Sequence, residues 1–173
     1  VTSITIGQIM ELKIKANTLQ VRNFLKGISR KQLSATQKSL NRVSNMAVLM
    51  ITKRTQSGNL PDGGKMLPYA KSTKKDREDR GRQTGFVDLT DTGKMFRSLD
   101  FKQRGTTNRL FFANKEREKI AAQHDFFGVG KRKTVRPFFS IGRSEEEELK
   151  NEFAKFYFSA VGLWVKEKTL QMI

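Results

Sequence analysis

The stretch that decides the fold is PYAKSTKKDREDRGRQTGFVDLTDTGKMFRSL, residues 68–99. It opens with the turn signal Pro68-Tyr69. Its far end carries apolar side chains, those of Met95, Phe96 and Leu99. Between these ends, residues 71–82 are charged and nearly free of apolar side chains, so they have nothing to bury. We therefore expect a long, mobile loop at about residues 58–86 that joins two anchored elements.

Two longer stretches on either side of this loop show the apolar spacing of helices. In residues 29–55 the apolar side chains recur three, four and seven residues apart and share one face. They are Leu33, Leu40, Val43, Ala47 and Met50. Gly27 separates this predicted helix from a short preceding element that carries Val21, Phe24 and Leu25.

The second helix is predicted at residues 144–168. Ser144 is a suitable N-cap, and Glu147 three residues later completes a capping box. A continuous apolar stripe follows, which is typical of a helix face buried in a core. It comprises Leu149, Phe153, Phe156, Tyr157, Ala160, Val161 and Trp164.

Shorter elements complete the pattern of an α+β protein. Residues 4–15 alternate in part between apolar and polar, which predicts a strand or an arm that orders only on a neighbour. Residues 105–108 form a turn between a strand that starts at Phe101 and a return strand at residues 110–112. A short helix is predicted at residues 116–124, with Ile120 and Ala121 inward, and Phe138, Phe139 and Ile141 predict a buried strand or extended segment.

These elements predict the organisation of the chain. Residues 1–28 form an N-terminal arm or strand, and residues 29–173 form a single α+β domain. In that domain a small antiparallel sheet is packed by the helices at 29–55 and 144–168, and the long extended loop projects from it.

Charge and composition limit the function. The net charge of +17 over 173 residues favours a polyanionic partner, which is either nucleic acid or an acidic protein surface. Residues 144–173 hold six acidic and four basic side chains, so the positive excess lies in the preceding residues. The absence of cysteine excludes disulfides, zinc–thiolate sites and thiol catalysis. No apolar run approaches the roughly 20 residues that span a bilayer, so we expect a soluble protein made in the cytoplasm.

Motifs that carry enzyme chemistry are not met. The stretch at 128–131, Gly-Val-Gly-Lys, lacks the first glycine and the final Ser/Thr of a phosphate-binding loop. His124 is the single histidine and has no partner at metal-ligand spacing. Asp88 and Asp91 could form a carboxylate pair, but Asp91 more plausibly caps a short helix that begins beyond it. We therefore expect no enzymatic activity, no cofactor and no metal.

Five short motifs occur in an order that resembles the virion-morphogenesis, or tail-completion, proteins of tailed bacteriophages. The chain reads Arg-Thr-x-x-Gly from Arg54, PDGG from Pro61 with LPYAxST after it, VDLTDTGKMxxSL from Val87, AxxHxFFG from Ala121 and VRPFFSIG from Val135. The family shows "DG-x-x-W-x-PLS-x-x-T", "L-x-DTG-x-L-x-x-S", "HQFG" and "RPFLG". The resemblance covers roughly residues 43–155, and departs from the family at Met66-Leu67 and at the longer His-Asp-Phe-Phe-Gly.

The resemblance implies a structural protein of the virion neck, made in the host cytoplasm. Such subunits form homo-oligomeric rings, expected here as a hexamer or dodecamer, around the channel for packaged double-stranded DNA, which they contact without sequence specificity. Implied partners are neighbouring neck, portal-adaptor and tail proteins, with no membrane. The alternatives are a tail-terminator or head-closure ring protein, and a nucleic-acid-binding protein without sequence specificity.

Two basic segments supply the candidate site residues. Residues 128–136 form a glycine-containing loop, in which Gly128 and Gly130 give the pliability to project. Its cations are candidates to face channel DNA or dock a partner; they are Lys131, Arg132 and Lys133. The long loop supplies candidates for contact between subunits, which are Lys74, Lys75, Arg77, Arg80 and Arg82.

Overall fold

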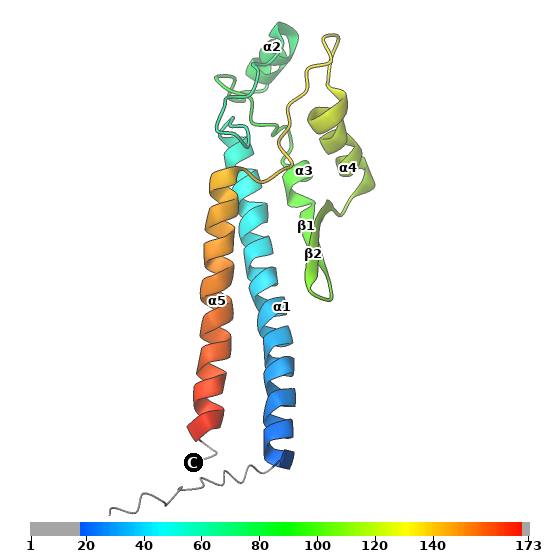
Figure 1. Ribbon diagram of the computed structural model, residues 1–173. Helices are drawn as coiled ribbons and strands as arrows, with labels where there is room; N and C mark the ends of the chain where they lie inside the picture. The colour runs from blue at the N-terminus through cyan, green and yellow to red at the C-terminus, as the bar shows by residue number, and fades with distance from the viewer. Residues whose placement is uncertain (1–17, 171–173) are drawn as a thin grey trace, which may run out of the picture.

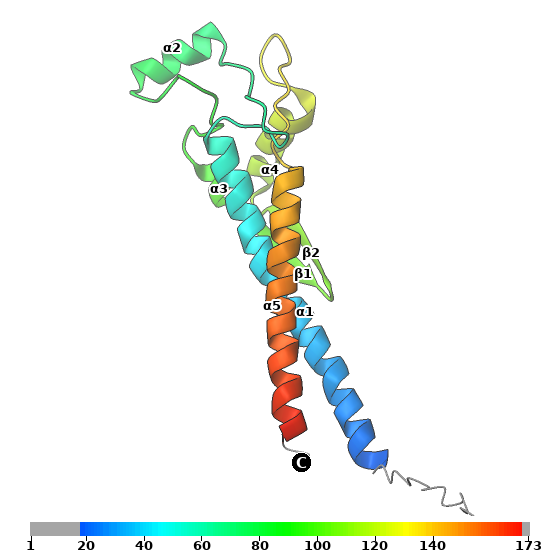
Figure 2. The ribbon, with the colours of Figure 1, turned by 60° about the vertical axis from the view of Figure 1, so that its left-hand side comes forward.

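The computed structural model describes residues 18–170. The strand or arm predicted at residues 4–15 lies outside the described residues. Two long helices, α1 (Thr18–Gln56) and α5 (Arg143–Leu170), run antiparallel side by side and form a stalk (Figures 1 and 2). We call the end where α1 ends and α5 begins the upper end. The remaining elements lie beside or above this upper half of the stalk.

Helix α1 begins much earlier than predicted. Gly27 does not end a preceding element but lies within α1, because the helix continues through it. A side chain at this position would press against the indole ring of Trp164 on α5, and the Phe24 ring stacks on the same indole with centroids 6.0 Å apart. Higher on the stalk, the Arg42 guanidinium lies 3.6 Å from the centroid of the Phe156 ring. Gly27 is thus a site of close helix approach, and not a boundary.

A two-stranded antiparallel sheet lies against α1. Strands β1 (Leu99–Arg104) and β2 (Thr107–Phe112) pair from Leu99 opposite Phe112 to Arg104 opposite Thr107, with Gly105 in the turn at φ +62°. The Asn108 amide donates to Asn41 Oδ1 and Ser44 Oγ of α1, both at 2.9 Å. These contacts fix the sheet on the helix and confirm the predicted α+β class and hairpin.

Two short helices pack beside the sheet. Helix α3 (Lys94–Arg97) precedes β1, and α4 (Lys115–Ala122) follows β2. The Asn114 side chain caps α4 by accepting from the backbone N–H groups of Glu116 and Arg117. A π-helical turn, η1 (Gln123–Phe127), continues α4, and α2 (Lys71–Asp79) lies at the upper end of the molecule. Among the described residues, no helix is long and apolar enough to cross a bilayer.

The buried core sits at the junction of α1, the sheet and the short helices. Its centre is Phe138, which is fully buried and meets Phe96 and Phe112 edge-on, with centroids 5.9 Å and 6.5 Å away. Phe138 is buried, as predicted, but its segment forms no strand and bends at Phe139 and Ser140. The other buried apolar residues are Ile51, Met66, Val87, Met95, Leu99 and Ala121.

The predicted core face of α5 is not buried to this degree. None of the described side chains of α5 is fully buried, and every residue of the predicted stripe is only half-buried. The reason is architectural: α5 packs mainly along α1, and one neighbouring helix covers only part of a wide apolar stripe. The stripe therefore contributes a half-buried helix contact.

Two predicted helix caps are also wrong. Helix α5 begins at Arg143, so Ser144 lies inside the helix and not at its N-cap. The Gly142 N–H donates to the Glu145 carboxylate at 2.9 Å, so Glu145, and not Glu147, makes the side-chain contact of the capping box. Asp91 does not cap α3, because Gly93 in the left-handed region precedes that helix and the Lys94 N–H donates to Thr92 Oγ1 at 3.4 Å.

Candidate functional site at the upper end

The segment predicted as an extended loop contains helix α2. All residues of α2 are exposed except Arg77, which is 5% exposed. The expectation that residues 71–82 bury nothing is therefore wrong. The segment has no apolar side chain to bury, but it buries a guanidinium, which needs hydrogen-bond acceptors and a counter-charge in place of an apolar pocket.

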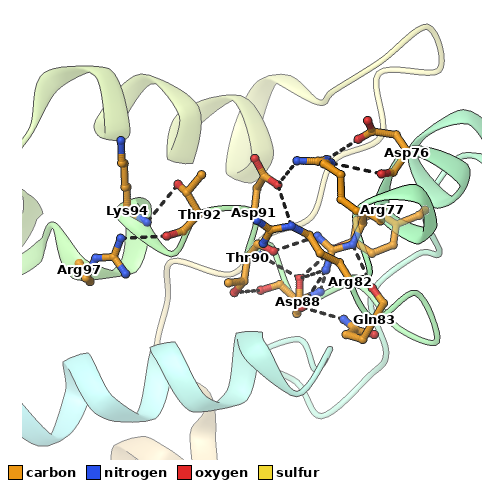
Figure 3. Close-up of polar contacts among 12 residues, drawn as sticks. Asp76, Arg77, Arg82, Gln83, Asp88, Thr90, Asp91, Thr92, Lys94 and Arg97 are labelled. Carbon is orange, nitrogen blue, oxygen red and sulfur yellow. Dashed lines mark hydrogen bonds and ion pairs between the residues drawn. The ribbon is translucent and has the colours of Figure 1, made fainter.

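Arg77 finds these partners on the chain that follows α2 (Figure 3). It donates to both carboxylate oxygens of Asp88 at 3.1 Å, to the Gln83 carbonyl at 3.0 Å and to the Thr90 carbonyl at 2.9 Å. Its guanidinium carbon also lies 4.6 Å from the centroid of the Tyr69 ring, within cation–π range. One arginine thus fastens α2 to residues on both sides of it.

Asp88 is the matching hub. Besides Arg77, its carboxylate accepts from Tyr69 Oη at 2.9 Å, Gln83 Nε2 at 2.7 Å and the Thr90 N–H at 2.8 Å. Burial alone would raise the pKa of Asp88, but these hydrogen bonds and the charge of Arg77 together hold that pKa below its ordinary value. The carboxylate is ionised and saturated with donors, so it acts as a structural anchor and not as a general base.

The outer cations of the same segment make exposed contacts. Arg80 pairs with Asp76 and, at 2.7 Å, with Asp91, and Arg82 lies 3.6 Å from the Asp91 carboxylate. Lys74 and Lys75 point outward on α2, with Lys74 Nζ 3.9 Å from Glu78. Of the five residues predicted to contact other subunits, Arg77 is therefore placed in the interior, and Lys74 and Lys75 are the most accessible.

Two further arginines fasten other loops to the upper end. Arg54, near the end of α1, donates to the backbone carbonyls of Phe138 and Ser140 at 2.6 Å and 2.8 Å and pairs with Glu145 of α5. Arg136 donates to the carbonyls of Leu67 and Pro68 at 3.2 Å and 3.1 Å. Burial lowers the pKa of both guanidinium groups.

Asp125 completes this scaffold from the π-helical turn. Its carboxylate is 8% exposed and accepts from the N–H groups of Phe138 and Phe139 at 2.7 Å and 2.8 Å. Sequence reasoning assigned no role to Arg54, Asp125 or Arg136. The sequence held one signal for these roles: each of the three charged residues lies within one of the motifs, close in the chain to apolar residues of the core.

The basic loop is a small hairpin at the top of the molecule (Figure 1). Val129 and Thr134 exchange backbone hydrogen bonds of 3.0 Å and 3.1 Å, and Lys133 takes a left-handed conformation at φ +45°. A Cβ at Gly128 would collide with the Lys133 carbonyl, so this glycine pins the hairpin and does not make it pliable. Lys131, Arg132 and Lys133 are all exposed at the tip.

Exposed aromatic side chains stand beside this basic hairpin. Phe126 and Phe127 of the π-helical turn are 69% and 72% exposed.

The preceding His124 is mostly buried, which lowers its pKa, and the positive charge of Arg136 lowers it further. Within residues 18–170, no group of three or more carboxylates or histidines could hold a metal ion.

The predicted site residues therefore form two separate exposed basic features, Lys74-Lys75 on α2 and residues 131–133 on the hairpin. The arginine contacts beneath them hold the loops in place. Searches for relatives found no match to the chain among family models, curated proteins or solved structures.

Proposed function

We propose that the chain is a structural virion protein of a tailed phage, a ring-forming tail-completion or neck subunit at the head–tail junction around the DNA channel. The observation that carries the proposal is the way the five motif segments meet. Arg54 holds the segment at 138–140, Arg136 holds residues 67–68, and Asp88 of the third motif accepts from Tyr69 of the second. Asp125 of the fourth motif accepts from the N–H groups of Phe138 and Phe139 of the fifth. The motifs that carry the resemblance thus build one scaffold.

The surface above that scaffold suits assembly. The exposed Phe126, Phe127 and Arg132 are of residue types enriched in protein interfaces, and Lys131 and Lys133 add positive charge beside them. The arginine and aspartate contacts fix the loops from which these side chains project. A rigid, basic and aromatic edge favours docking to acidic neighbours or close approach to DNA.

Electron microscopy tests the ring directly. The purified chain should form hexameric or dodecameric rings with a central channel, and particles made without it should show incomplete necks. Particles that lack the chain and still join normal tails to heads would overturn the proposal.

A charge-reversal variant separates the two roles of the hairpin. We replace Lys131, Arg132 and Lys133 with Glu, and use Lys102→Glu, Arg104→Glu and Arg109→Glu on the exposed sheet as the matched control. A channel role predicts that particles assemble but retain or eject DNA badly. A docking role predicts heads and tails that never join.

The rival function is direct binding of nucleic acid. A neck subunit should bind DNA weakly, without sequence preference, and with an affinity that falls steeply as salt rises. Tight binding of a preferred sequence by the free chain at physiological salt would favour the rival and count against the neck assignment.

A further inference from the structure

In the stalk, α1 is basic toward the lower end, and α5 is acidic at the upper end. Residues 22–42 of α1 contain six cations and no acidic residue; they are Arg22, Lys26, Arg30, Lys31, Lys38 and Arg42. Residues 144–152 of α5 contain five glutamates and one lysine. Most of these side chains are exposed. We call the first set the basic stretch and the second the acidic stretch.

Within one chain these two stretches cannot neutralise each other. The acidic stretch begins at the upper end of the stalk, where Glu145 pairs with Arg54 near the end of α1. The basic stretch lies further along α1, from Arg42 toward the opposite end of the stalk (Figure 2). The charged pairs inside the acidic stretch, such as Glu146 with Lys150, are exposed, and exposed pairs contribute little.

The stalk also leaves apolar side chains uncovered. On α1, Leu25 and Leu33 are 56% and 49% exposed, in the same part of the helix as the basic stretch. On α5, Phe158 and Leu163 follow the acidic stretch and are 69% exposed. Each helix thus presents a charged surface with large apolar groups beside it, and the charges of the two helices are complementary.

We propose that the acidic stretch of α5 docks on the basic stretch of α1 in a second copy of this chain, with the exposed apolar side chains of both helices covered in the same contact. This inference rests on the proposed ring function and names the contact that joins its subunits. The contact is heterologous, because it joins different surfaces of the two copies, and repetition of such a contact closes a ring when the rotation permits.

The charges of the two stretches, and not the net charge of the chain, favour a second copy as the occupant. Copies that each carry +17 repel one another, so assembly needs surfaces of opposite sign at the contact. The acidic stretch is a concentrated negative surface on a strongly basic chain. Docked on the basic stretch of a neighbour, it replaces repulsion with attraction and fixes the direction of assembly.

Two reversed variants test the contact. The first is Lys26→Glu with Arg30→Glu, and the second is Glu148→Lys with Glu152→Lys; both pairs are four residues apart on their helices. The matched control is Lys102→Glu with Arg109→Glu on the sheet, which makes the same change of charge as the first variant. Oligomer size is measured by analytical ultracentrifugation, and circular dichroism checks that each variant is folded.

Each stalk variant alone should raise the dissociation constant of the oligomer at least about tenfold, because the net charge of the basic stretch falls from +6 to +2 in the first variant and that of the acidic stretch changes from −4 to 0 in the second. The control should assemble like the native chain. An equal mixture of the two stalk variants should associate more strongly than either variant alone, because the unchanged acidic stretch of the first then meets the unchanged basic stretch of the second. Combining all four substitutions in one chain should weaken assembly further, because stretches of net charge +2 and 0 then face each other.

Other outcomes overturn the contact and stay distinguishable from failure of the ring. Native-like rings from both stalk variants would refute the stalk contact and leave the ring function standing. Loss of DNA retention in particles, with unchanged oligomer size for Lys26→Glu with Arg30→Glu, would assign the basic stretch to DNA. A native chain that stays monomeric at every concentration would overturn the contact and the ring together.

Discussion

Replacing Asp88 with Asn tests whether the buried ion pair holds α2 in place. The substitution keeps the shape of the side chain, removes its charge and leaves Arg77 without a counter-charge at 5% exposure. Removing one partner of a buried ion pair costs about 3–5 kcal/mol. We expect a loss of about 3 kcal/mol, because the Asn oxygen can still accept one of the hydrogen bonds.

Hydrogen exchange measures this loss where it occurs. Helix α2 rests on polar contacts, so it should open locally before the core unfolds. A loss of about 3 kcal/mol corresponds to exchange of the α2 amides that is faster by about a hundredfold. Asp91→Asn is the matched control, because Asp91 pairs with Arg80 and Arg82 but is exposed, so its exchange should change little. Equal α2 exchange rates in the two variants would refute the role assigned to Asp88.

The pH dependence of the same exchange follows from the pKa of Asp88. That pKa lies below its ordinary value in the folded state, so the stabilisation is present above the unfolded pKa of about 3.9. It is lost as pH falls through the lower folded pKa. Helix α2 should therefore stay protected at neutral pH and open only in acid, and Asp88→Asn should remove that acid step.

Three further predictions concern other parts of the molecule. The pKa of His124 is lowered in the folded state, so the neutral imidazole stabilises the fold above about pH 6.5, and this stabilisation is lost as pH falls through the folded pKa. His124→Gln should therefore make the melting temperature depend less on pH below about 6.5. Gly128→Ala should disrupt the basic hairpin, visible as altered amide shifts at residues 128–134, while core signals stay unchanged. Phe158→Ala should leave the melting temperature of the monomer near native and weaken self-association, because this ring is 69% exposed.

The sequence predicted the elements better than their burial. Apolar periodicity located both long helices, and turn residues located the β-hairpin. The start of α1 was missed because Gly27 reads as a helix breaker, while its role is to let Trp164 approach. Periodicity predicts the α5 stripe as core because it shows which side chains share a face, but not how many neighbouring elements cover that face.

Within the candidate site, the exposed cations of the hairpin could be predicted from the sequence. The buried polar contacts that hold the loops in place could not. The exposure of Lys131, Arg132 and Lys133 follows from a basic, glycine-containing loop. The burial of Arg77 does not, because its neighbours along the chain are all polar. Its partner Asp88 lies eleven residues further on, and only the fold brings the two together.

Arginine is the residue that makes such a chain foldable. With 36% hydrophobic residues, the chain cannot hold every loop by apolar burial. Arg54, Arg77 and Arg136 each donate to two backbone carbonyls outside their own stretch of chain. A guanidinium offers five donors in a fixed plane and is less strongly hydrated than an ammonium, so it can bridge carbonyls where a lysine could not. Arginine side chains thus hold the loops of the upper end in place.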